Sequence, residues 1–547
     1  MVVHRKKLAG ILGIAAAIIA SIVVLTWYLS FNTIEVHARP HYFVWKIVSH
    51  ALRQSGMPAA VGLNQKDFFE LPLLKLGSWC LRAFGGTYQA MMTYQYFFLT
   101  LLLASCGAFA WRLGGPYAGA CAAWLAFFAP TSLGLATNAD DQLILQALTA
   151  AGLALVVWTD QPRTRWLALL AALPVVLAVE LMVYITNALI MWGTFACGAF
   201  AILVWQWVKW TGSAWSDDHK RVWPHPWFST VGVLLALAAG LLVLWPQFSQ
   251  FGYGDYYSGE LSKSTYVSLG KDPLVVLAYP TTWFRMLVGP ALAMACLLSF
   301  IVAWRAKKLG EALVAGGWLF LPMIFLTLIS KRQDFYLFYA VPGSFALAAL
   351  GLAALPEKWI RPGITVLLAA FMINYWVALL TIQNFKYPNT IRGLTLFSTP
   401  YLAPPDKNRE NREEQRLADW VDQECGRRGL HTLLMMYVEK GIDPWALWLW
   451  HRNPNLAPAD LASSDLLPGD RRCIIAYLPI PKPAVSLAEA LGVFETYVKE
   501  RRNSHFSLSY PTVMLKIAAL QKIADAYRYA GSRNGFSLFI PEQRSAN

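Results

Sequence analysis

Charged residues in this sequence stand beside long apolar segments, where burial in a membrane costs free energy unless the residue serves a site. A carboxylate in such a place can accept the proton of an attacking hydroxyl, and a pair of cations can bind a departing phosphate. The residues of this kind are Glu35 with His37 and Arg39, the pair Asp140 and Asp141, Glu180, and the pair Lys331 and Arg332. We therefore treat them as candidates for a catalytic site.

Each candidate also has a purely structural explanation. The aspartate pair could cap the helix that follows it, because acidic residues favour a helix N-terminus. The Lys331–Arg332 pair could anchor the chain with its stems in the bilayer and its charges in water. Glu180 could be a hydrogen-bonded core carboxyl, and Glu35 an ordinary loop carboxylate. The residue types alone leave these alternatives open.

The composition assigns the chain to a broad class. Of the 547 residues, 56% are hydrophobic and only 14% are charged, and the chain holds 24 tryptophans. The mean hydropathy is +0.42. A soluble protein of this length does not need so much apolar sequence, so the composition predicts an integral membrane protein. It excludes a disordered chain, a small disulfide-rich protein and a nucleic-acid-binding module, in spite of the net charge of +14.

Apolar segments of membrane-spanning length precede a more polar tail. A helix needs roughly 20 apolar residues to cross a bilayer. About eleven segments meet that length, at 8–29, 90–110, 116–136, 142–158, 166–184, 188–207, 228–246, 284–304, 312–330, 335–355 and 363–383. Of the 162 residues after Phe385, 38 are charged, against 40 of the first 385. We therefore predict a membrane domain over 1–385 and a soluble domain over 386–547.

Basic residues in the short connections indicate how these spans are oriented. Lysine and arginine dominate alternate connections, as at Arg163, Lys220 and Arg305, whereas the other connections are nearly balanced in charge. Because cytoplasmic loops are the basic ones, we predict a cytoplasmic N-terminus with an uncleaved first span and a tail outside the cytoplasm. Two large loops, 31–89 and 247–283, are then external. The candidate site residues share that outer face.

The tail alternates helical and extended patterns. Helical patterns cover 412–428, 444–451 and 512–529, and extended ones cover 431–438, 472–479 and 536–541, which predicts a small α/β domain. Cys425 and Cys473, the two cysteines of the tail, could pair as a disulfide in an oxidising exterior or remain two buried thiols. The other five cysteines lie in or beside apolar segments and behave as small apolar residues.

Chemistry at the outer lipid boundary narrows the class of reaction. A lipid-linked phosphosugar places its phosphate at this depth, where cations can bind it while a carboxylate takes the proton of the acceptor hydroxyl. No nucleotide is available outside, which favours a polyprenyl-phosphate donor. A secondary transporter or lipid flippase is an alternative, but transporters place charges near the bilayer midplane and often contain internal repeats, which this sequence lacks. An oligosaccharide polymerase or ligase is another, but its large external domain usually lies between spans.

Short motifs resemble those of the membrane-embedded GT-C glycosyltransferases, most of all the bacterial aminoarabinose and galacturonic acid transferases and the protein O-mannosyltransferases. The resemblance covers roughly residues 1–355. It rests on Glu35-Val-His-Ala-Arg-Pro-His-Tyr42, Phe68-Phe-Glu-Leu-Pro-Leu-Leu-Lys75, Phe84-Gly, Ala136-Thr-Asn-Ala-Asp-Asp141 and Ser330-Lys-Arg-Gln-Asp-Phe-Tyr-Leu-Phe-Tyr-Ala-Val-Pro342. It implies a GT-C-type fold in the bacterial inner membrane and an inverting transfer of a sugar from polyprenyl phosphate to a hydroxyl of a lipid, glycan or protein.

The resemblance also implies a role for each motif. Glu35 corresponds to the catalytic base, with His37 as a substitute because this sequence has one carboxylate where the family often has an Asp-Glu pair. Lys331 and Arg332 correspond to the cations on the donor phosphate.

The remaining motif residues are implied to form the rest of the donor site. Asp140 and Asp141 correspond to donor-site residues that in some members act through a divalent metal ion. Leu71 stands where the family usually has lysine, and Lys75 lies one helical turn further on. Besides Lys75, the motifs add His37, Arg39 and Glu70 to the expected donor-binding residues.

Overall fold

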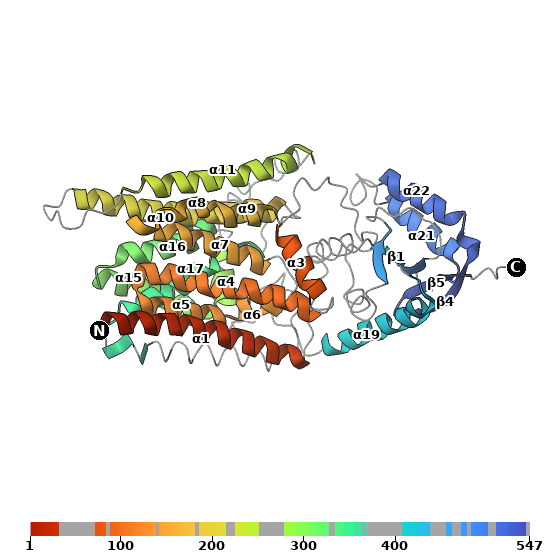
Figure 1. Ribbon diagram of the computed structural model, residues 1–547, viewed down its shortest axis with the longest axis horizontal. Helices are drawn as coiled ribbons and strands as arrows, with labels where there is room; N and C mark the ends of the chain where they lie inside the picture. The colour runs from red at the N-terminus through yellow and green to blue at the C-terminus, as the bar shows by residue number, and fades with distance from the viewer. Residues whose placement is uncertain are drawn as a thin grey trace. The chain divides into compact units, whose positions relative to one another are not determined.

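A computed structural model of the chain contains two compact units, drawn as ribbons in Figure 1. It describes residues 2–31, 72–83, 88–137, 142–180, 185–214, 225–250, 278–327, 334–356, 358–360, 362–363, 366, 369, 407–430, 432–437, 456–461, 472–478, 483–500 and 510–542. One unit holds the first helix and most helices up to residue 353, and the other holds a five-stranded sheet with its helices.

The first unit is built of helices that run side by side in Figure 1. They are α1 (Val2–Phe31), α4 (Tyr88–Gly114), α5 (Pro116–Phe128), α6 (Pro130–Thr137), α7 (Gln142–Trp158), α8 (Leu167–Leu170), α9 (Ala172–Glu180), α10 (Ile185–Ala214), α11 (Trp227–Gln250), α14 (Ala278–Thr282), the π-helix η3 (Trp283–Leu287), α15 (Gly289–Arg305), α16 (Leu309–Thr327), the 3₁₀ helix η4 (Asp334–Leu337) and α17 (Val341–Ala353). Helices thus occupy each predicted apolar segment from 8–29 to 335–355, and most of 363–383 lies outside the described residues.

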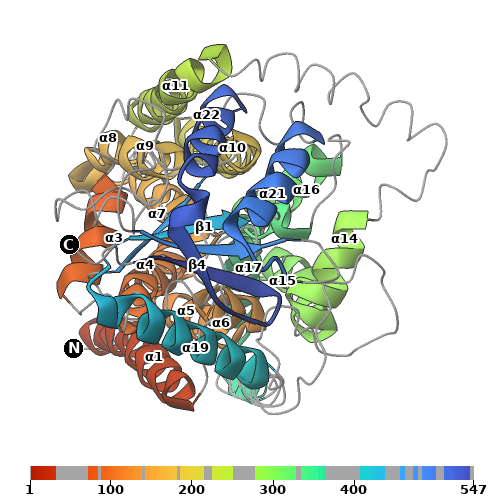
Figure 2. The ribbon, with the colours of Figure 1, turned by 90° about the vertical axis from the view of Figure 1, so that its right-hand side faces the viewer.

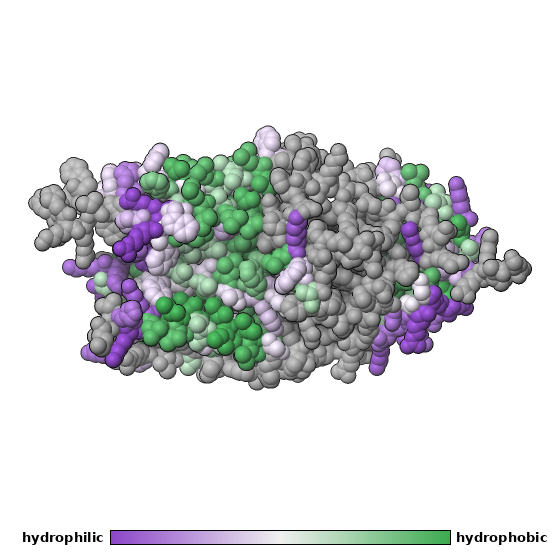
Figure 3. Space-filling model, viewed as in Figure 1, coloured by the Kyte–Doolittle hydropathy of each residue, from purple (hydrophilic) through white to green (hydrophobic). Residues whose placement is uncertain are grey.

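Five of these helices are long and apolar enough to cross a membrane: His4–Thr26, Thr93–Gly114, Leu189–Gly212, Trp227–Trp245 and Leu309–Thr327. Five shorter apolar helices accompany them: Pro116–Phe128, Gln142–Trp158, Leu167–Ala178, Ala291–Arg305 and Val341–Ala353. The chain is therefore a polytopic helical protein, and the count of eleven spans stays a prediction. Apolar side chains gather on the outer surface over α1 and α11 in Figure 3. The exposed apolar side chains of these two helices include Ile11, Ile19, Leu234 and Leu242. Such a surface suits contact with lipid.

Proline and glycine explain local departures from continuous spans. The predicted segment 116–136 is broken at Ala129, whose backbone is extended, because Pro130 has no N–H with which to continue α5. Glycine allows α1 to approach α5 closely. A Cβ on Gly13 would lie 2.6 Å from the Cβ of Ala120, so only glycine fits at this contact.

The second unit contains a mixed sheet of strand order β2-β1-β3-β5-β4. Its strands are β1 (Thr432–Tyr437), β2 (Ala457–Asp460), β3 (Cys473–Tyr477), β4 (Tyr527–Arg533) and β5 (Phe536–Pro541). The first three strands of that order are parallel, and β5 pairs antiparallel with β3 and β4. Figure 2 shows α21 (Leu487–Glu500) and α22 (Tyr510–Gln521) over one face and α19 (Lys407–Glu424) over the other. The unit also holds α3 (Pro72–Ala83).

Alternating side chains of the sheet build the core under α21 and α22. Leu434 of β1 and Ile474 of β3 are buried in one apolar cluster with Leu491, Phe494 and Ile517 of the helices. The intervening residues of each strand point to the other face, since successive strand residues alternate sides.

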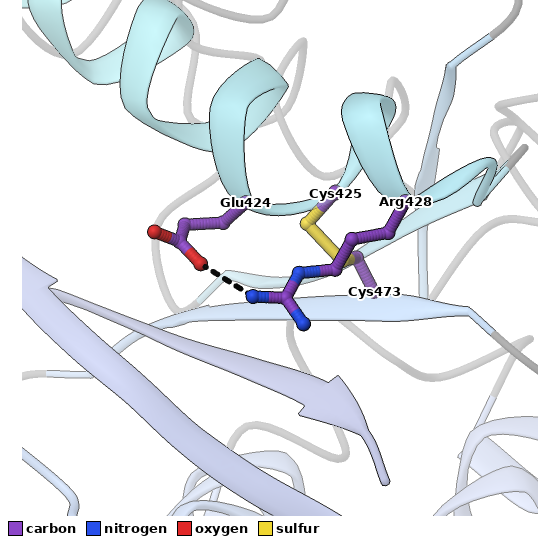
Figure 4. Close-up of a disulfide and its surroundings, with 4 residues drawn as sticks. All are labelled: Glu424, Cys425, Arg428 and Cys473. Carbon is purple, nitrogen blue, oxygen red and sulfur yellow. Dashed lines mark hydrogen bonds and ion pairs between the residues drawn. A yellow bond between two sulfur atoms is a disulfide. The ribbon is translucent and has the colours of Figure 1, made fainter. Parts of the chain in front are cut away.

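A disulfide links the end of α19 to the sheet. Cys425, directly after α19, bonds to Cys473 at the start of β3, with their Cα atoms 6.1 Å apart (Figure 4). The alternative of two free thiols is therefore wrong. Beside the bond, Arg428 forms an ion pair with Glu424 at 3.4 Å, one helical turn apart on the exposed surface.

One predicted helix of the tail is partly wrong. The pattern 512–529 predicts a single helix, but α22 ends at Gln521 and Tyr527 begins β4. Pairing of β4 with β5 satisfies the backbone of Tyr527–Tyr529 and overrides the helical spacing of its side chains. The predicted helix 444–451 lies outside the described residues.

Candidate functional site

Most residues of the predicted site lie outside the part of the chain that the structure describes. These are Glu35, His37, Arg39, Glu70, Asp140, Asp141, Lys331 and Arg332. Lys75 is described: it stands on α3, within the predicted external loop 31–89, and its side chain is exposed. Glu180 is the last residue of α9. Their roles therefore remain predictions, and the structure describes the elements that lie next to them in the sequence.

Helix ends border the predicted site residues on both sides. Helix α6 ends at Thr137 and α7 begins at Gln142, so Asp140 and Asp141 belong to the short link between them. Helix α16 ends at Thr327 and η4 begins at Asp334, so Lys331 and Arg332 belong to a second link. The helices on either side of both links belong to the same unit.

Buried hydrogen bonds join the elements that follow these two links. The hydroxyl of Tyr339 donates to Oε1 of Gln142 at 2.7 Å. One turn along α7, Nε2 of Gln146 donates to the carbonyl of Phe338 at 2.9 Å. From α16, Nε1 of Trp318 donates to the carbonyl of Tyr339 at 3.1 Å. Three side chains from two helices thus fix the turn between η4 and α17.

The same turn lies in an almost solvent-free environment. Tyr336, Phe338 and Tyr339 are at most 1% exposed, Gln146 is fully buried, and Gln142 is 6% exposed. A hydrogen bond between uncharged groups is stronger and more directional there than in water, so it holds a fixed distance between the two elements. The structure therefore brings the start of α7, next to Asp141, against the turn that follows Lys331 and Arg332.

A π-helical turn contacts α17, the helix that follows the turn with Tyr339. The residues Trp283–Leu287 of η3 wind with wider turns than an α-helix, and such turns are frequent at functional sites. Nε1 of Trp283 donates to Oγ of Ser344 in α17 at 2.9 Å, and Sγ of Cys296 contacts the carbonyl of Ser344 at 3.2 Å. The predicted external loop 247–283 is thus helical at both described ends, because α11 continues to Gln250 and α14 begins at Ala278.

Charged pairs hold the opposite ends of the helices, on the predicted cytoplasmic side. Arg112 of α4 makes a two-point ion pair with Asp160, whose side chain is 3% exposed. Burial raises the pKa of Asp160, and the hydrogen bonds and charge of Arg112 oppose that rise. Lys209 of α10 pairs with Glu311 of α16 at 2.6 Å, and its Nζ lies 4.2 Å from the ring centroid of Trp205. These pairs connect the helices, and the sequence analysis missed them.

A metal site gains no support from the described residues. No group of three or more His, Cys, Asp or Glu side chains that could hold an ion occurs in that part of the chain. The carboxylates of Asp140 and Asp141 are oxygen donors of the kind that magnesium and manganese prefer. The divalent ion stays a prediction tied to that pair.

No protein-family model matches the chain, and no curated protein matches it by sequence. Solved structures do match. ArnT from Cupriavidus metallidurans bound to undecaprenyl phosphate covers 98% of both chains with a TM-score of 0.52 at 13% identity. The same enzyme in the apo state covers 96% of this chain and 97% of its own with a TM-score of 0.50 at 13% identity.

An archaeal structure is also similar over most of the chain. The Archaeoglobus fulgidus oligosaccharyltransferase in the apo form covers 98% of this chain and 75% of its own, with a TM-score of 0.47 at 11% identity. Like ArnT, it is a GT-C superfamily membrane glycosyltransferase. The predicted resemblance to GT-C membrane glycosyltransferases is confirmed at the level of the fold.

Proposed function

We propose that this protein is a membrane glycosyltransferase that moves a sugar from a polyprenyl-phosphate donor to an acceptor hydroxyl outside the cytoplasm. The observation that carries this proposal is the similarity to ArnT over 98% of both chains. The ArnT structure holds undecaprenyl phosphate, which is the product that such a donor leaves behind. The proposed donor-site residues Asp141 and Lys331 belong to links next to the described helices α7 and η4 in the sequence.

In the proposed reaction, Glu35 takes the proton of the acceptor hydroxyl as its oxygen attacks the anomeric carbon. The carbon–oxygen bond to the phosphate breaks on the opposite face, so the configuration inverts and polyprenyl phosphate leaves with the bonding electrons. Lys331 and Arg332 stabilise the charge that develops on that phosphate. His37, Arg39, Glu70 and Lys75 complete the donor surface.

A divalent ion at Asp140 and Asp141 would add positive charge beside the phosphate. The two carboxylates would hold it, and their position directly before α7 places them at a helix N-terminus.

The disulfide supports the proposed orientation. Disulfides form and persist outside the cytoplasm, whereas the bacterial cytoplasm keeps thiols reduced. The Cys425–Cys473 bond therefore fits a tail on the periplasmic face of the inner membrane, with the N-terminus in the cytoplasm. The acceptor, whether a lipid, a glycan or a protein, would then meet the donor on that side.

Transfer with purified protein tests the proposal. The protein in detergent is incubated with undecaprenyl-phosphate esters of radiolabelled aminoarabinose, galacturonic acid or mannose and an envelope lipid extract as acceptor. We expect release of undecaprenyl phosphate together with labelled acceptor. A transporter or flippase would leave every donor ester intact, and that result would overturn the proposal.

The variant Glu35→Gln tests the base. We expect transfer to fall by about 10²–10⁴-fold while binding of undecaprenyl phosphate stays at the wild-type level, because the amide cannot accept the proton. The matched control is Glu500→Gln, an exposed carboxylate at the end of α21, which should transfer like the wild type. Normal turnover by Glu35→Gln would remove that residue from the mechanism.

A further inference from the structure

Two arginines at the predicted cytoplasmic end of the helical unit have no carboxylate partner. Arg163 lies in the 3₁₀ helix η1 (Pro162–Thr164) and is exposed, and Arg165 directly follows that helix and is half-buried. Neither arginine forms an ion pair with a residue that the structure describes. The neighbouring Asp160 is already bound by Arg112. Two positive charges on this connection are therefore available to an anion from outside the chain.

Contacts within the unit hold these arginines in place. The hydroxyl of Thr164 donates to the carbonyl of Trp158, the last residue of α7, at 2.6 Å. The Cζ atom of Arg165 lies 5.8 Å from the ring centroid of Phe228, near the start of α11, and a cation is attracted to the face of an aromatic ring. The Nε atom of Arg165 has no hydrogen-bond partner among the described residues. The ring thus positions the guanidinium group without satisfying its N–H donors.

Exposed aromatic rings accompany the two arginines. Trp166 directly follows Arg165, and Trp166, Trp227 and Phe228 are each more than half exposed. Helices α8 and α11 lie side by side in Figure 1, and a Cβ on Gly232 of α11 would lie 2.5 Å from the Cβ of Ala168 in α8. Tryptophan rings are enriched at the headgroup level of a membrane. The rings therefore indicate that the arginines lie at the depth of lipid headgroups.

Apolar surface continues from the rings along the helices. Leu169 of α8 and Leu173 of α9 are exposed, as are Leu234 and Leu235 of α11. Figure 3 shows apolar side chains over α11. One end of this surface is thus cationic and the rest is apolar, which matches a molecule with an anionic head and hydrocarbon chains.

We propose that this surface binds an anionic phospholipid of the surrounding membrane. Arg163 and Arg165 donate hydrogen bonds to its phosphate, because a planar guanidinium group matches two phosphate oxygens. Phe228 orients Arg165, and the acyl chains lie along α8 and α11. Basic pockets between membrane helices on the cytoplasmic side bind anionic lipid heads in the same way. The predicted sugar donor lies at the other end of the helices, so this proposal is independent of the proposed function.

Native mass spectrometry of the full-length protein in detergent tests the proposal. The protein is titrated with phosphatidylglycerol or with zwitterionic phosphatidylcholine, and the dissociation constants of the first bound lipid are compared. We expect the wild type to bind phosphatidylglycerol more tightly. The double variant Arg163→Gln, Arg165→Gln should bind it about thirtyfold more weakly, since each basic residue beside anionic lipid contributes about a factor of five.

Two further variants separate this site from general surface charge. Lys307→Gln with Lys308→Gln removes the same charge from two exposed residues between α15 and α16, and should bind phosphatidylglycerol like the wild type. Phe228→Leu keeps every charge and removes the ring beneath Arg165, and should weaken binding about threefold. Thermal unfolding in the same detergent shows whether each variant keeps its fold. If the double arginine variant unfolds, the exposed Arg163→Gln alone should weaken binding about fivefold.

Three results would overturn the proposal: equal affinity of the wild type for the two lipids, equal losses in the lysine and arginine variants, or wild-type affinity in the arginine variant. Undecaprenyl phosphate also joins a phosphate to an apolar chain and is titrated in parallel. If the arginine variant loses undecaprenyl phosphate and keeps phosphatidylglycerol, the surface binds the donor lipid and the proposal is wrong. Sugar transfer is not measured, so failure of the proposed function leaves this test intact.

Discussion

Opening the Cys425–Cys473 disulfide should destabilise the unit that contains the sheet. The bond joins residues 48 positions apart, and both cysteines are fully buried. In the chain-entropy model, closing a loop of that length adds about 4 kcal/mol to the free energy of unfolding at 25 °C. Because each 1.4 kcal/mol is about a factor of ten, the unfolded population of this unit should rise about 10³-fold without the bond.

Pulse proteolysis of the full-length protein in detergent measures that population. The variant carries alanine at both positions, since serine would bury two new hydroxyls. A brief protease pulse at increasing urea, followed by detection of the C-terminal fragment, gives the urea midpoint. We expect a lower midpoint for the double variant and for the wild type treated with a reductant. The double variant treated with the same reductant is the control, because the other described cysteines are free and should not respond.

Two results would refute this reasoning. The first is an equal urea midpoint for the oxidised and the reduced wild type, which would mean that the bond constrains nothing that unfolds. The second is alkylation of Cys425 and Cys473 in protein purified without reductant, which would show that the bond does not form in the cell. The second result would also remove the support that the disulfide gives to a periplasmic tail.

Two further substitutions test the packing of the helical unit. Arg112→Met leaves the buried carboxylate of Asp160 without its partner and should cost about 3–5 kcal/mol, visible as a lower thermal midpoint in detergent, with partial recovery when Asp160→Leu is added. Gly351→Ala forces a Cβ to within 2.8 Å of the Cα of Ser299 and should cost about 1–3 kcal/mol by the same measurement. Gly212→Ala is its control: a Cβ there meets no atom within 4 Å, so the helix should become slightly more stable.

The sequence predicts the helices well because length and apolarity are properties of one segment at a time. Strands are predicted where they are central: the patterns 431–438, 472–479 and 536–541 contain β1, β3 and β5. Of the edge strands, β2 was not predicted, and the start of β4 was predicted as part of a helix. Strand β2 has only four residues, including Pro458, and β4 carries polar and glycine residues at its end. Edge strands depend on a partner far along the chain, and no local pattern records that partner.

The side-chain contacts next to the predicted site residues were harder to predict from the sequence than the helices and the central strands. The site residues predicted from the sequence are charged, whereas the described contacts beside them in the sequence use Gln142, Gln146 and Tyr339, which are uncharged. One signal was available: Gln142 and Gln146 stand one turn apart on the same face of an otherwise apolar helix, and a buried amide needs a partner. The identity of that partner, 192–197 residues away, depends on tertiary contacts.

The use of neutral groups at one end of the helices and ion pairs at the other follows from the proposed chemistry. At the predicted cytoplasmic end, Arg112 and Lys209 are each neutralised by a carboxylate, so they fasten helices and offer no free charge. A carboxylate placed in the same way beside Lys331 and Arg332 would compete with the donor phosphate for those cations and weaken its binding. Hydrogen bonds from Tyr339, Gln146 and Trp318 hold the described turn between η4 and α17 without adding a charged group there. The described hydrogen bonds at this end are therefore compatible with the binding of an anionic lipid phosphate by nearby cations, as proposed.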